Sequence, residues 1–327
     1  MGPDTQDHGT VAAARDWGAY WRGRTGGPGD ALAGVERAPE LDAFWATVFS
    51  GLPKTTRVLD LACGAGTVLR AARAAGLGEL TGLDVSAEAL AALRARLPGV
   101  ATVAASADAP PFASGSFDRV SSQFGVEYAD LARAAPTAAA LLASNGRLVW
   151  LCHHAEGAIA AEVRGRRAEA EAIRESGFVE RAKAVFRADA GEAAAFGRAA
   201  ARFGAAQDAV MALARDGSGL AAHLYGGTQR LWERRASYAL EDVTGWLDGM
   251  AGEIAAFEGR MGGMLAAALS DADVAELRAR LEAAGLVVET GAVELGGRVA
   301  AWRVEAGRVE AGRVEAGRGE SRRGVRV

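Results

Sequence analysis

Two acidic residues and two glycines in the first third of the chain have the spacing of a ligand-binding turn. Asp60 ends a short apolar run, and Gly64 and Gly66 follow it. Glycine permits positive φ and lets a ligand lie against bare main chain. The residues after it have helical spacing, so a ligand could bind at the N-terminus of that helix. Asp84 closes the next apolar run, eighteen residues after Gly66, where a carboxylate could accept both ribose hydroxyls of a nucleoside.

A pair of adjacent histidines, His153 and His154, is the second pattern that could perform chemistry. Imidazole titrates near neutral pH and can act as a general base. Because successive residues of a strand point to opposite faces, at most one of the two should face a site at the strand end. A polar strand end without a catalytic role is the alternative. His223, with Tyr225 nearby, is a further base candidate. The adjacent histidines lack a spaced third ligand, so no metal site is predicted.

Alternating strands and helices between residues 56 and 154 would position these side chains. Apolar runs predict strands in the segments 58–61, 79–86 and 100–106, a strand anchored by Phe117 and Val120, and a segment 141–154 that comprises a helix end, a glycine turn and a strand. Ser86 would cap the helix that follows the second strand, and an acid at Asp84 could serve the same purpose. Two further strands, 286–290 and 298–304, suit a terminal hairpin. Ligands of such parallel sheets bind at the carboxyl ends of the strands.

The ordered set of motifs from about residue 56 to 154 resembles the class I S-adenosylmethionine-dependent methyltransferases. Ala62 stands where the family has its first glycine, and Leu69 stands where a dinucleotide fingerprint needs a third small residue. A nicotinamide-dependent oxidoreductase is therefore disfavoured. The resemblance implies an α/β fold, with a seven-stranded, mostly parallel, doubly wound sheet and an antiparallel last strand inserted between the fifth and sixth.

The resemblance also implies S-adenosylmethionine as the cofactor. Asp108 would accept the exocyclic amino group of adenine, and the loop 121–125 would lie beneath the reacting methyl group, followed by Glu127 and Tyr128. Either His153 or His154 is the candidate general base. The cofactor-binding residues expected from the resemblance are Tyr20, Asp60, Ala62, Gly64, Gly66, Asp84, Val85, Ala107, Asp108 and Gln123.

Composition limits the classes of partner. A net charge of −4 and a pI near 5.7 argue against a nucleic-acid groove. Two cysteines are too few for a disulfide framework and suggest a reducing compartment. No apolar run approaches the roughly 20 residues that cross a membrane. We therefore expect a cytoplasmic protein without nucleic-acid or membrane partners, whose partner is a small-molecule substrate.

The chain is predicted to have five parts. Residues 1–54 form an N-terminal helical lid, in which an aromatic helix over 11–22 either docks on the core or closes over the cofactor. Residues 55–154 form the core and 270–304 complete it. The segment 155–269 is a helical insertion, either a substrate cap or a homodimer interface. A low-complexity tail, 305–327, repeats VEAGR and is expected to be disordered.

These patterns favour methyl transfer to a small-molecule acceptor by in-line displacement, which positioning accelerates. The family's aminated-base enzymes carry Asp/Asn-Pro-Pro-Tyr/Phe after the fourth strand, whereas residues 122–125 here are Ser-Gln-Phe-Gly, so DNA-adenine methylation is disfavoured. A non-catalytic S-adenosylmethionine-binding or scaffold protein is the main alternative. The sequence identifies neither the acceptor nor the acceptor atom.

Overall fold

The structure is a computed structural model that describes residues 21, 39–189, 192–215, 217 and 219–308. The chain divides into two compact units. The first, here called the sheet unit, comprises Met1–Glu162 and Met264–Val327, and the second, the helical unit, comprises Val163–Gly263. Most of the predicted N-terminal lid, including Tyr20, lies outside the described residues.

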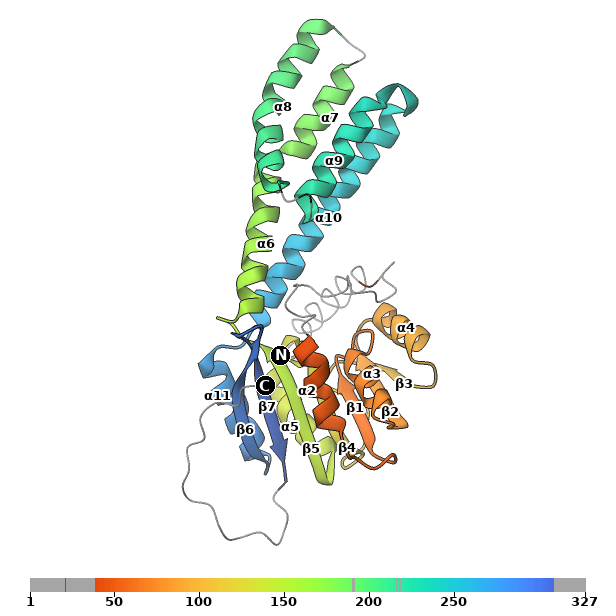
Figure 1. Ribbon diagram of the computed structural model, residues 1–327, viewed down its shortest axis with the longest axis vertical. Coiled ribbons are helices and arrows are strands. Elements are labelled where there is room, and N and C mark those ends of the chain that lie inside the picture. Colours follow the sequence, from red (N-terminus) through yellow and green to blue (C-terminus); the bar gives the residue numbers. More distant parts are fainter. Residues whose placement is uncertain (1–20, 22–38, 190–191, 216, 218, 309–327) are drawn as a thin grey trace, which may run out of the picture. The chain divides into compact units, whose positions relative to one another are not determined.

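A seven-stranded sheet forms the centre of the sheet unit, with the strand order β3-β2-β1-β4-β5-β7-β6 (Figure 1). Strands β1 to β5 pair in parallel, whereas β7 runs antiparallel to both of its neighbours. The prediction of a mostly parallel sheet, with an antiparallel last strand inserted between the fifth and sixth, is confirmed. The strands are β1 (Arg57–Leu61), β2 (Glu79–Asp84), β3 (Ala101–Ala104), β4 (Phe117–Gln123), β5 (Leu142–His153), β6 (Val287–Leu295) and β7 (Arg298–Gly307).

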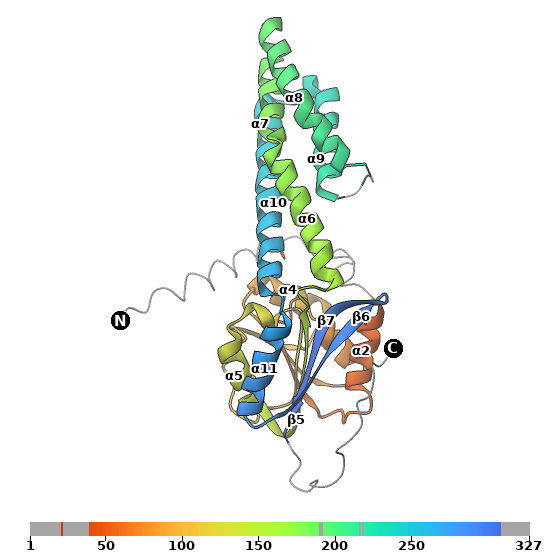
Figure 2. The same ribbon diagram turned by 90° about the vertical axis from the view of Figure 1, so that its left-hand side faces the viewer.

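Helices cover both faces of this sheet. Figure 2 shows α5 and α11 on one side of the strands and α2 on the other. Four buried alanines of α5 let that helix lie close to the sheet, beside the fully buried Trp150 of β5. The helical elements of the sheet unit are α2 (Pro39–Phe49), α3 (Thr67–Ala74), α4 (Ala87–Arg96), the 3₁₀ turn η2 (Val126–Tyr128), α5 (Leu131–Leu141) and α11 (Asp271–Ala283).

Strand β5 differs from the sequence prediction at its start. A glycine turn was expected between the preceding helix and the strand, but β5 begins at Leu142, immediately after α5. Gly146 lies inside the strand, where the pairing with β4 shifts register between Phe117↔Leu142 and Arg119↔Arg147. A Cβ on Gly146 would lie 2.9 Å from the main-chain nitrogen of Ala143. Glycine therefore permits a bulge in a continuous strand rather than a turn before it.

Strand β7 continues three residues past Val304, where the sequence predicted the fold to end. Glu305 to Gly307 pair with both β5 and β6, and Ala306 is buried opposite Leu148. The predicted tail boundary was therefore wrong, because the first repeat of the VEAGR motif alternates suitably for a strand with one buried face. The segment 309–327 lies outside the described residues.

The helical unit has an apolar core of its own, contributed by α6, α7, α8, α9 and α10. Within it, Gly227 of α9 contacts the indole of Trp246 so closely that a Cβ there would overlap the ring. None of the helices in the described residues is long and apolar enough to span a membrane. The helices are α6 (Ala158–Glu175), α7 (Phe178–Ala188), α8 (Ala193–Leu213), α9 (Gly219–Glu233), the short turn η3 (Arg235–Ser237) and α10 (Leu240–Ala267).

Candidate cofactor and active site

The turn after β1 is held in shape by the carboxylate of Asp84 at the end of β2. The main-chain N–H of Gly64 donates to Asp84 Oδ2 and that of Ser86 donates to Oδ1, each at 2.9 Å. Gly64 and Gly66 have positive φ values of 52° and 86°, and Ala62 has a φ of 50°. A Cβ on Gly66 would overlap the side chain of Leu93, so this position requires glycine for space as well as for φ.

In the structure, Ser86 rather than Asp84 caps the N-terminus of α4. The hydroxyl of Ser86 accepts a hydrogen bond from the N–H of Ala89 at 3.1 Å, and α4 starts directly after it. Because Ser86 satisfies the helix end, the carboxylate of Asp84 is available to hold the glycine turn. Asp84 therefore connects the ends of β1 and β2 at the carboxyl edge of the sheet.

Two buried carboxyl groups lie at this edge. Asp60 is 1% exposed and Asp84 is 8% exposed. Burial is the main cause that raises the pKa of Asp60 to about 7, and the charge of Asp84 also raises it. A hydrogen bond from the Ser121 hydroxyl at 3.0 Å lowers this pKa and so opposes the rise. Burial also raises the pKa of Asp84, although main-chain hydrogen bonds from Ser86 and Gly64 oppose that rise. Two acids close to one another and shielded from water favour a ligand with positive charge.

The hydrogen bonds to these two acids leave some of their oxygen lone pairs available for such a ligand. In the described part of the chain, Asp60 and Asp84 accept hydrogen bonds from main-chain amides and from the Ser121 hydroxyl, and no Lys or Arg bonds to either. A carboxylate has about four lone-pair sites, so Asp84 can also accept ligand hydroxyls. S-adenosylmethionine carries a ribose diol, a sulfonium and an ammonium group, and these residues therefore fit it.

A second buried pair lies at the ends of β4 and β5. Glu127 Oε1 accepts hydrogen bonds from the main-chain N–H of His153 at 2.9 Å and lies 2.8 Å from its Nδ1. The imidazole is 1% exposed and stacks on Phe124 with a ring distance of 4.5 Å, while Tyr128 contacts it edge-on. Phe124 has a positive φ of 54°, an uncommon conformation for a bulky residue. The position of His153 is therefore fixed by a carboxylate and by aromatic packing.

His154 lies in different surroundings. Its ring stacks on Trp302 of β7 at 4.5 Å and 11°, and its Nδ1 accepts the N–H of Glu156. The structure thus separates the two adjacent histidines, as the alternation of a strand requires. Only His153 contacts the segment that follows β4.

The remaining predicted cofactor residues occupy several environments. Gln123 ends β4, and its side-chain oxygen accepts a hydrogen bond from the indole N–H of Trp45 in α2. Asp108 lies after β3, with an oxygen 4.0 Å from Arg133 Nη1. The side chain of Ala107 is buried in the core, so a ligand could meet only its main chain.

Val85 and Tyr20 are the last two members of the predicted set. Val85 directly follows Asp84, and its main-chain N–H contributes to holding that carboxylate. Tyr20 lies outside the described residues. Its neighbour Trp21 is described, and the indole lies 3.1 Å from where a Cβ of Gly64 would be. This aromatic residue of the predicted N-terminal lid therefore lies against the glycine turn.

The pairing of Glu127 with His153 was not predicted from the sequence, although Glu127 follows β4 and His153 ends the neighbouring parallel strand β5.

The other histidine candidate lies elsewhere. His223 and Tyr225 lie on α9 in the helical unit, where His223 is exposed and Tyr225 accepts a hydrogen bond from Gln229. Among the residues that the structure describes, no three His, Cys, Asp or Glu side chains are grouped so that they could hold a metal ion.

Part of the chain matches a known protein family. A family described as a methyltransferase domain matches residues 58–146, which contain the glycine turn, Asp60, Asp84 and Glu127. A comparison with curated proteins finds no match.

Several solved structures with similarity to the chain are methyltransferases. They include an S-adenosylmethionine-dependent methyltransferase from Mesorhizobium loti (31% identity, TM-score 0.33, covering 37% of this chain and 57% of that one). Another is a putative methyltransferase from Haloferax volcanii in complex with the activator Trm112 (26%, 0.34, 45% and 59%). A third is geranyl diphosphate C-methyltransferase from Streptomyces coelicolor, in complex with Mg²⁺, geranyl diphosphate and S-adenosyl-L-homocysteine (17%, 0.37, 46% and 66%).

The chain spans less than two thirds of the length of each of these three proteins. The matched segment 58–146 contains β2, β3, β4 and all of β1 except Arg57, and the sheet has the order that the family resemblance implies. Residues 58–146 therefore match a methyltransferase domain, and the acids at the strand ends fit S-adenosylmethionine as its cofactor.

Proposed function

We propose that the protein transfers a methyl group from S-adenosylmethionine to a small-molecule acceptor by in-line displacement, with His153 as the general base. The observation that supports this proposal most directly is the buried pair of Glu127 and His153 at the ends of β4 and β5. Glu127 follows β4, the neighbour of β1, and His153 ends β5, so the pair lies at the same carboxyl edge of the sheet as the acids of the cofactor site.

Four groups would hold the cofactor. Asp84 would accept the ribose hydroxyls, and Asp108 would accept the amino group of adenine. The main chain of Gly64 and Gly66 would contact the amino-acid portion, close to the buried carboxyl of Asp60. When bound, S-adenosylmethionine supplies a methyl group that its sulfonium activates for transfer to a nucleophile. The residues need only orient the acceptor and exclude water.

The role of His153 follows from its hydrogen bond to Glu127. With Glu127 Oε1 accepting from Nδ1–H, the imidazole keeps its lone pair on Nε2. Nε2 would take the proton that a hydroxyl or protonated amine acceptor must lose. Glu127 would then stabilise the resulting imidazolium, as the carboxylate of a catalytic triad does. Glu127 is thus a positioning residue.

Two sequence features favour a small acceptor over a nucleic acid. The net charge is −4, whereas a nucleic-acid groove requires a coherent basic surface. Residues 122–125 are Ser-Gln-Phe-Gly, and their main chain leads into η2 rather than presenting the Pro-Pro pair of aminated-base enzymes.

Titration calorimetry with S-adenosylmethionine tests the cofactor site. We expect Asp84→Asn and Asp84→Ala to weaken binding at least tenfold, since charge-assisted hydrogen bonds contribute about 1.5–3 kcal/mol. Asp118→Asn is the matched control, because Asp118 pairs with Arg57 at 2.9 Å in the same sheet. Thermal melts verify that each variant is folded. Unchanged affinity in folded Asp84 variants would remove the ribose assignment.

Methyl transfer to a panel of small phenols, alcohols and amines tests the base. His153→Gln should lower kcat by about 10²–10⁴-fold and abolish the acidic limb of its pH profile, with the cofactor Kd within twofold of the parent value. His154→Gln is the matched control and should stay within threefold in kcat. If the cofactor binds but no panel member is methylated, the non-catalytic binding alternative gains support. Equal losses in the two histidine variants would contradict the assignment of His153.

A further inference from the structure

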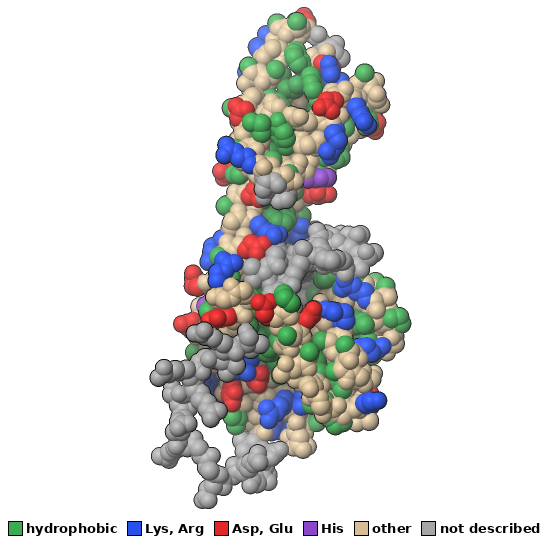
Figure 3. Space-filling view, viewed as in Figure 1, with side chains coloured by type: hydrophobic (Ala, Val, Ile, Leu, Met, Phe, Trp, Pro, Cys, Tyr) green, Lys and Arg blue, Asp and Glu red, His purple; other side chains and the backbone are tan. Residues whose placement is uncertain are grey.

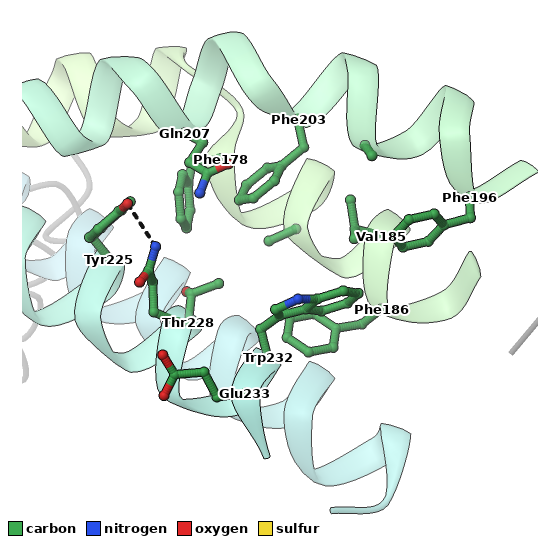
Figure 4. A pocket seen from close by; sticks show the side chains of 13 residues that line it. Phe178, Val185, Phe186, Phe196, Phe203, Gln207, Tyr225, Thr228, Trp232 and Glu233 are labelled. Atoms are coloured by element: carbon green, nitrogen blue, oxygen red, sulfur yellow. Dashed lines mark hydrogen bonds between the residues drawn. The ribbon is translucent and has the colours of Figure 1, made fainter. Parts of the chain in front are cut away.

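The helical unit contains a cavity of about 270 Å³ between α7, α8 and α9 (Figure 4). Figure 3 shows apolar side chains gathered over α7 and α8 on one face of this unit. Each of the three helices contributes two aromatic side chains to the wall. They are Phe178 and Phe186 on α7, Phe196 and Phe203 on α8, and Tyr225 and Trp232 on α9.

The aromatic rings pack against one another around the cavity. Phe178 packs on Phe203 at a centroid distance of 4.9 Å, and Trp232 contacts Phe186 at 5.3 Å and Phe196 at 5.8 Å. The space opens to solvent on one side, where the lining residues Gln229 and Glu233 are exposed. Since each ring pair links two different helices, the walls keep the space open and give it a defined shape.

The volume indicates the size of the ligand. An apolar cavity of about 150 Å³ is sufficient for benzene. At 270 Å³, this cavity is nearly twice as large, which suits two fused rings. Two small residues, Ala182 and Ala200, line it where larger side chains would fill the space.

The polar lining residues indicate the chemistry of the ligand. Thr228 donates to the carbonyl of Leu224 in its own helix, and Gln229 donates to the Tyr225 hydroxyl, so these groups are engaged. The Gln207 side chain points into the cavity from α8 beside Phe178 (Figure 4), and it bonds to no other described residue. Gln207 is half-buried, and its amide can form a hydrogen bond with a ligand that carries one hydrogen-bonding group.

The charges around the cavity favour a neutral ligand. Glu233 is the charged residue of the lining and disfavours an anion. The face of Trp232 is taken by the guanidinium of Arg235, which lies 4.3 Å from the ring centroid, and this reduces its attraction for a ligand cation.

We propose that this cavity is a binding site for a neutral, two-ring apolar molecule that carries one hydrogen-bonding group, which Gln207 recognises. The proposal goes beyond methyl transfer and does not depend on it, because all of its residues belong to the helical unit. The ligand is either a methyl acceptor or an effector, and the same cavity chemistry serves both.

Titration of the full-length protein with 2-naphthol, followed by calorimetry, tests the site. We expect saturable binding of one molecule, tighter than that of phenol, which fills half the space, and tighter than that of 1-hydroxypyrene, which exceeds it. Ala200→Phe fills the cavity without removing a contact and should weaken 2-naphthol binding at least tenfold. Ala201→Phe is the matched control, because Ala201 is the exposed neighbour in the same helix and should leave the affinity within twofold.

Gln207→Leu tests the contribution of the hydrogen bond separately from that of the apolar contacts. It should weaken 2-naphthol binding about fivefold and leave the binding of naphthalene unchanged. Asp84→Asn should leave 2-naphthol binding intact, so that failure of the cofactor site and failure of this site are distinguishable. If 2-naphthol does not bind saturably, or if Ala200→Phe and Ala201→Phe bind it equally, the proposal is wrong. Methylated 2-naphthol in the presence of S-adenosylmethionine would identify the ligand as an acceptor, whereas binding without methylation, together with a change in the Kd for S-adenosylmethionine, would identify it as an effector.

Discussion

Replacing Asp60 with asparagine tests the electrostatics of the cofactor edge. The wild-type carboxyl is fully buried, and its pKa rises from 3.8 to about 7 in the folded protein, chiefly because burial disfavours the charge. The folded state therefore prefers the protonated acid. The resulting stability is fully present below the unfolded pKa of 3.8 and is lost as the pH rises through 7. Asparagine has a similar shape and cannot ionise, so it does not undergo this loss.

The linkage relation gives the size of the effect. Between pH 5 and pH 8, the unfolded carboxyl is already ionised while the folded one is still losing its proton. The free energy of unfolding of the wild type should then fall by about 2.5 kcal/mol relative to Asp60→Asn. The asparagine amide introduces its own packing and hydrogen-bonding cost, but that cost is the same at both pH values. The change in the difference between the two proteins therefore isolates the titration of Asp60.

Urea unfolding at pH 5 and pH 8 measures this change, with hydrogen exchange of the β1 amides reporting on the sheet unit. Asp118→Asn serves as the control, because Arg57 lowers the pKa of Asp118 by hydrogen bonding, so this carboxyl is ionised in the folded and the unfolded protein at both pH values and its substitution should cost the same at pH 5 and pH 8. If the wild type and Asp60→Asn differ by the same free energy at both pH values, the reasoning about a buried, protonated acid is refuted.

Two further predictions concern packing. Gly227→Ala should destabilise the helical unit by about 1–3 kcal/mol, because the new methyl group would overlap the indole of Trp246. Gly226→Ala, whose nearest neighbour would be Arg230 Nη1 at 3.4 Å, should be neutral or stabilising by up to about 1 kcal/mol; thermal unfolding of the two variants compares them, and equal melting temperatures would contradict the contact. Cys63 and Cys152 should resist a thiol reagent at pH 8 until the protein is unfolded, because burial raises both thiol pKa values well above the ordinary value. Rapid labelling of either cysteine in the native protein would contradict this prediction.

The order of strands and helices from residue 56 to 154 followed from local patterns. The apolar run ending at Leu61, the positive φ needed after it and the cap at Ser86 are properties of a few adjacent residues, and the chain keeps them wherever it folds. The strand order and the antiparallel β7 came from the family resemblance, which the sheet confirms. Asp84 was correctly placed at the end of β2, since the end of a strand is a local property.

Contacts between distant segments required the tertiary structure. The pairing of Glu127 with His153 spans 26 residues and depends on the register of β4 against β5, and that register contains a bulge which the sequence suggested was a turn. The extension of β7 to Gly307 also depended on partners in β5 and β6, because a polar repeat forms a strand only where neighbouring strands take up its hydrogen bonds. The cavity of the helical unit arises from three helices meeting through aromatic rings, and no single helix encodes it. Local sequence therefore determined the elements, whereas side-chain packing between elements decided which residues face one another.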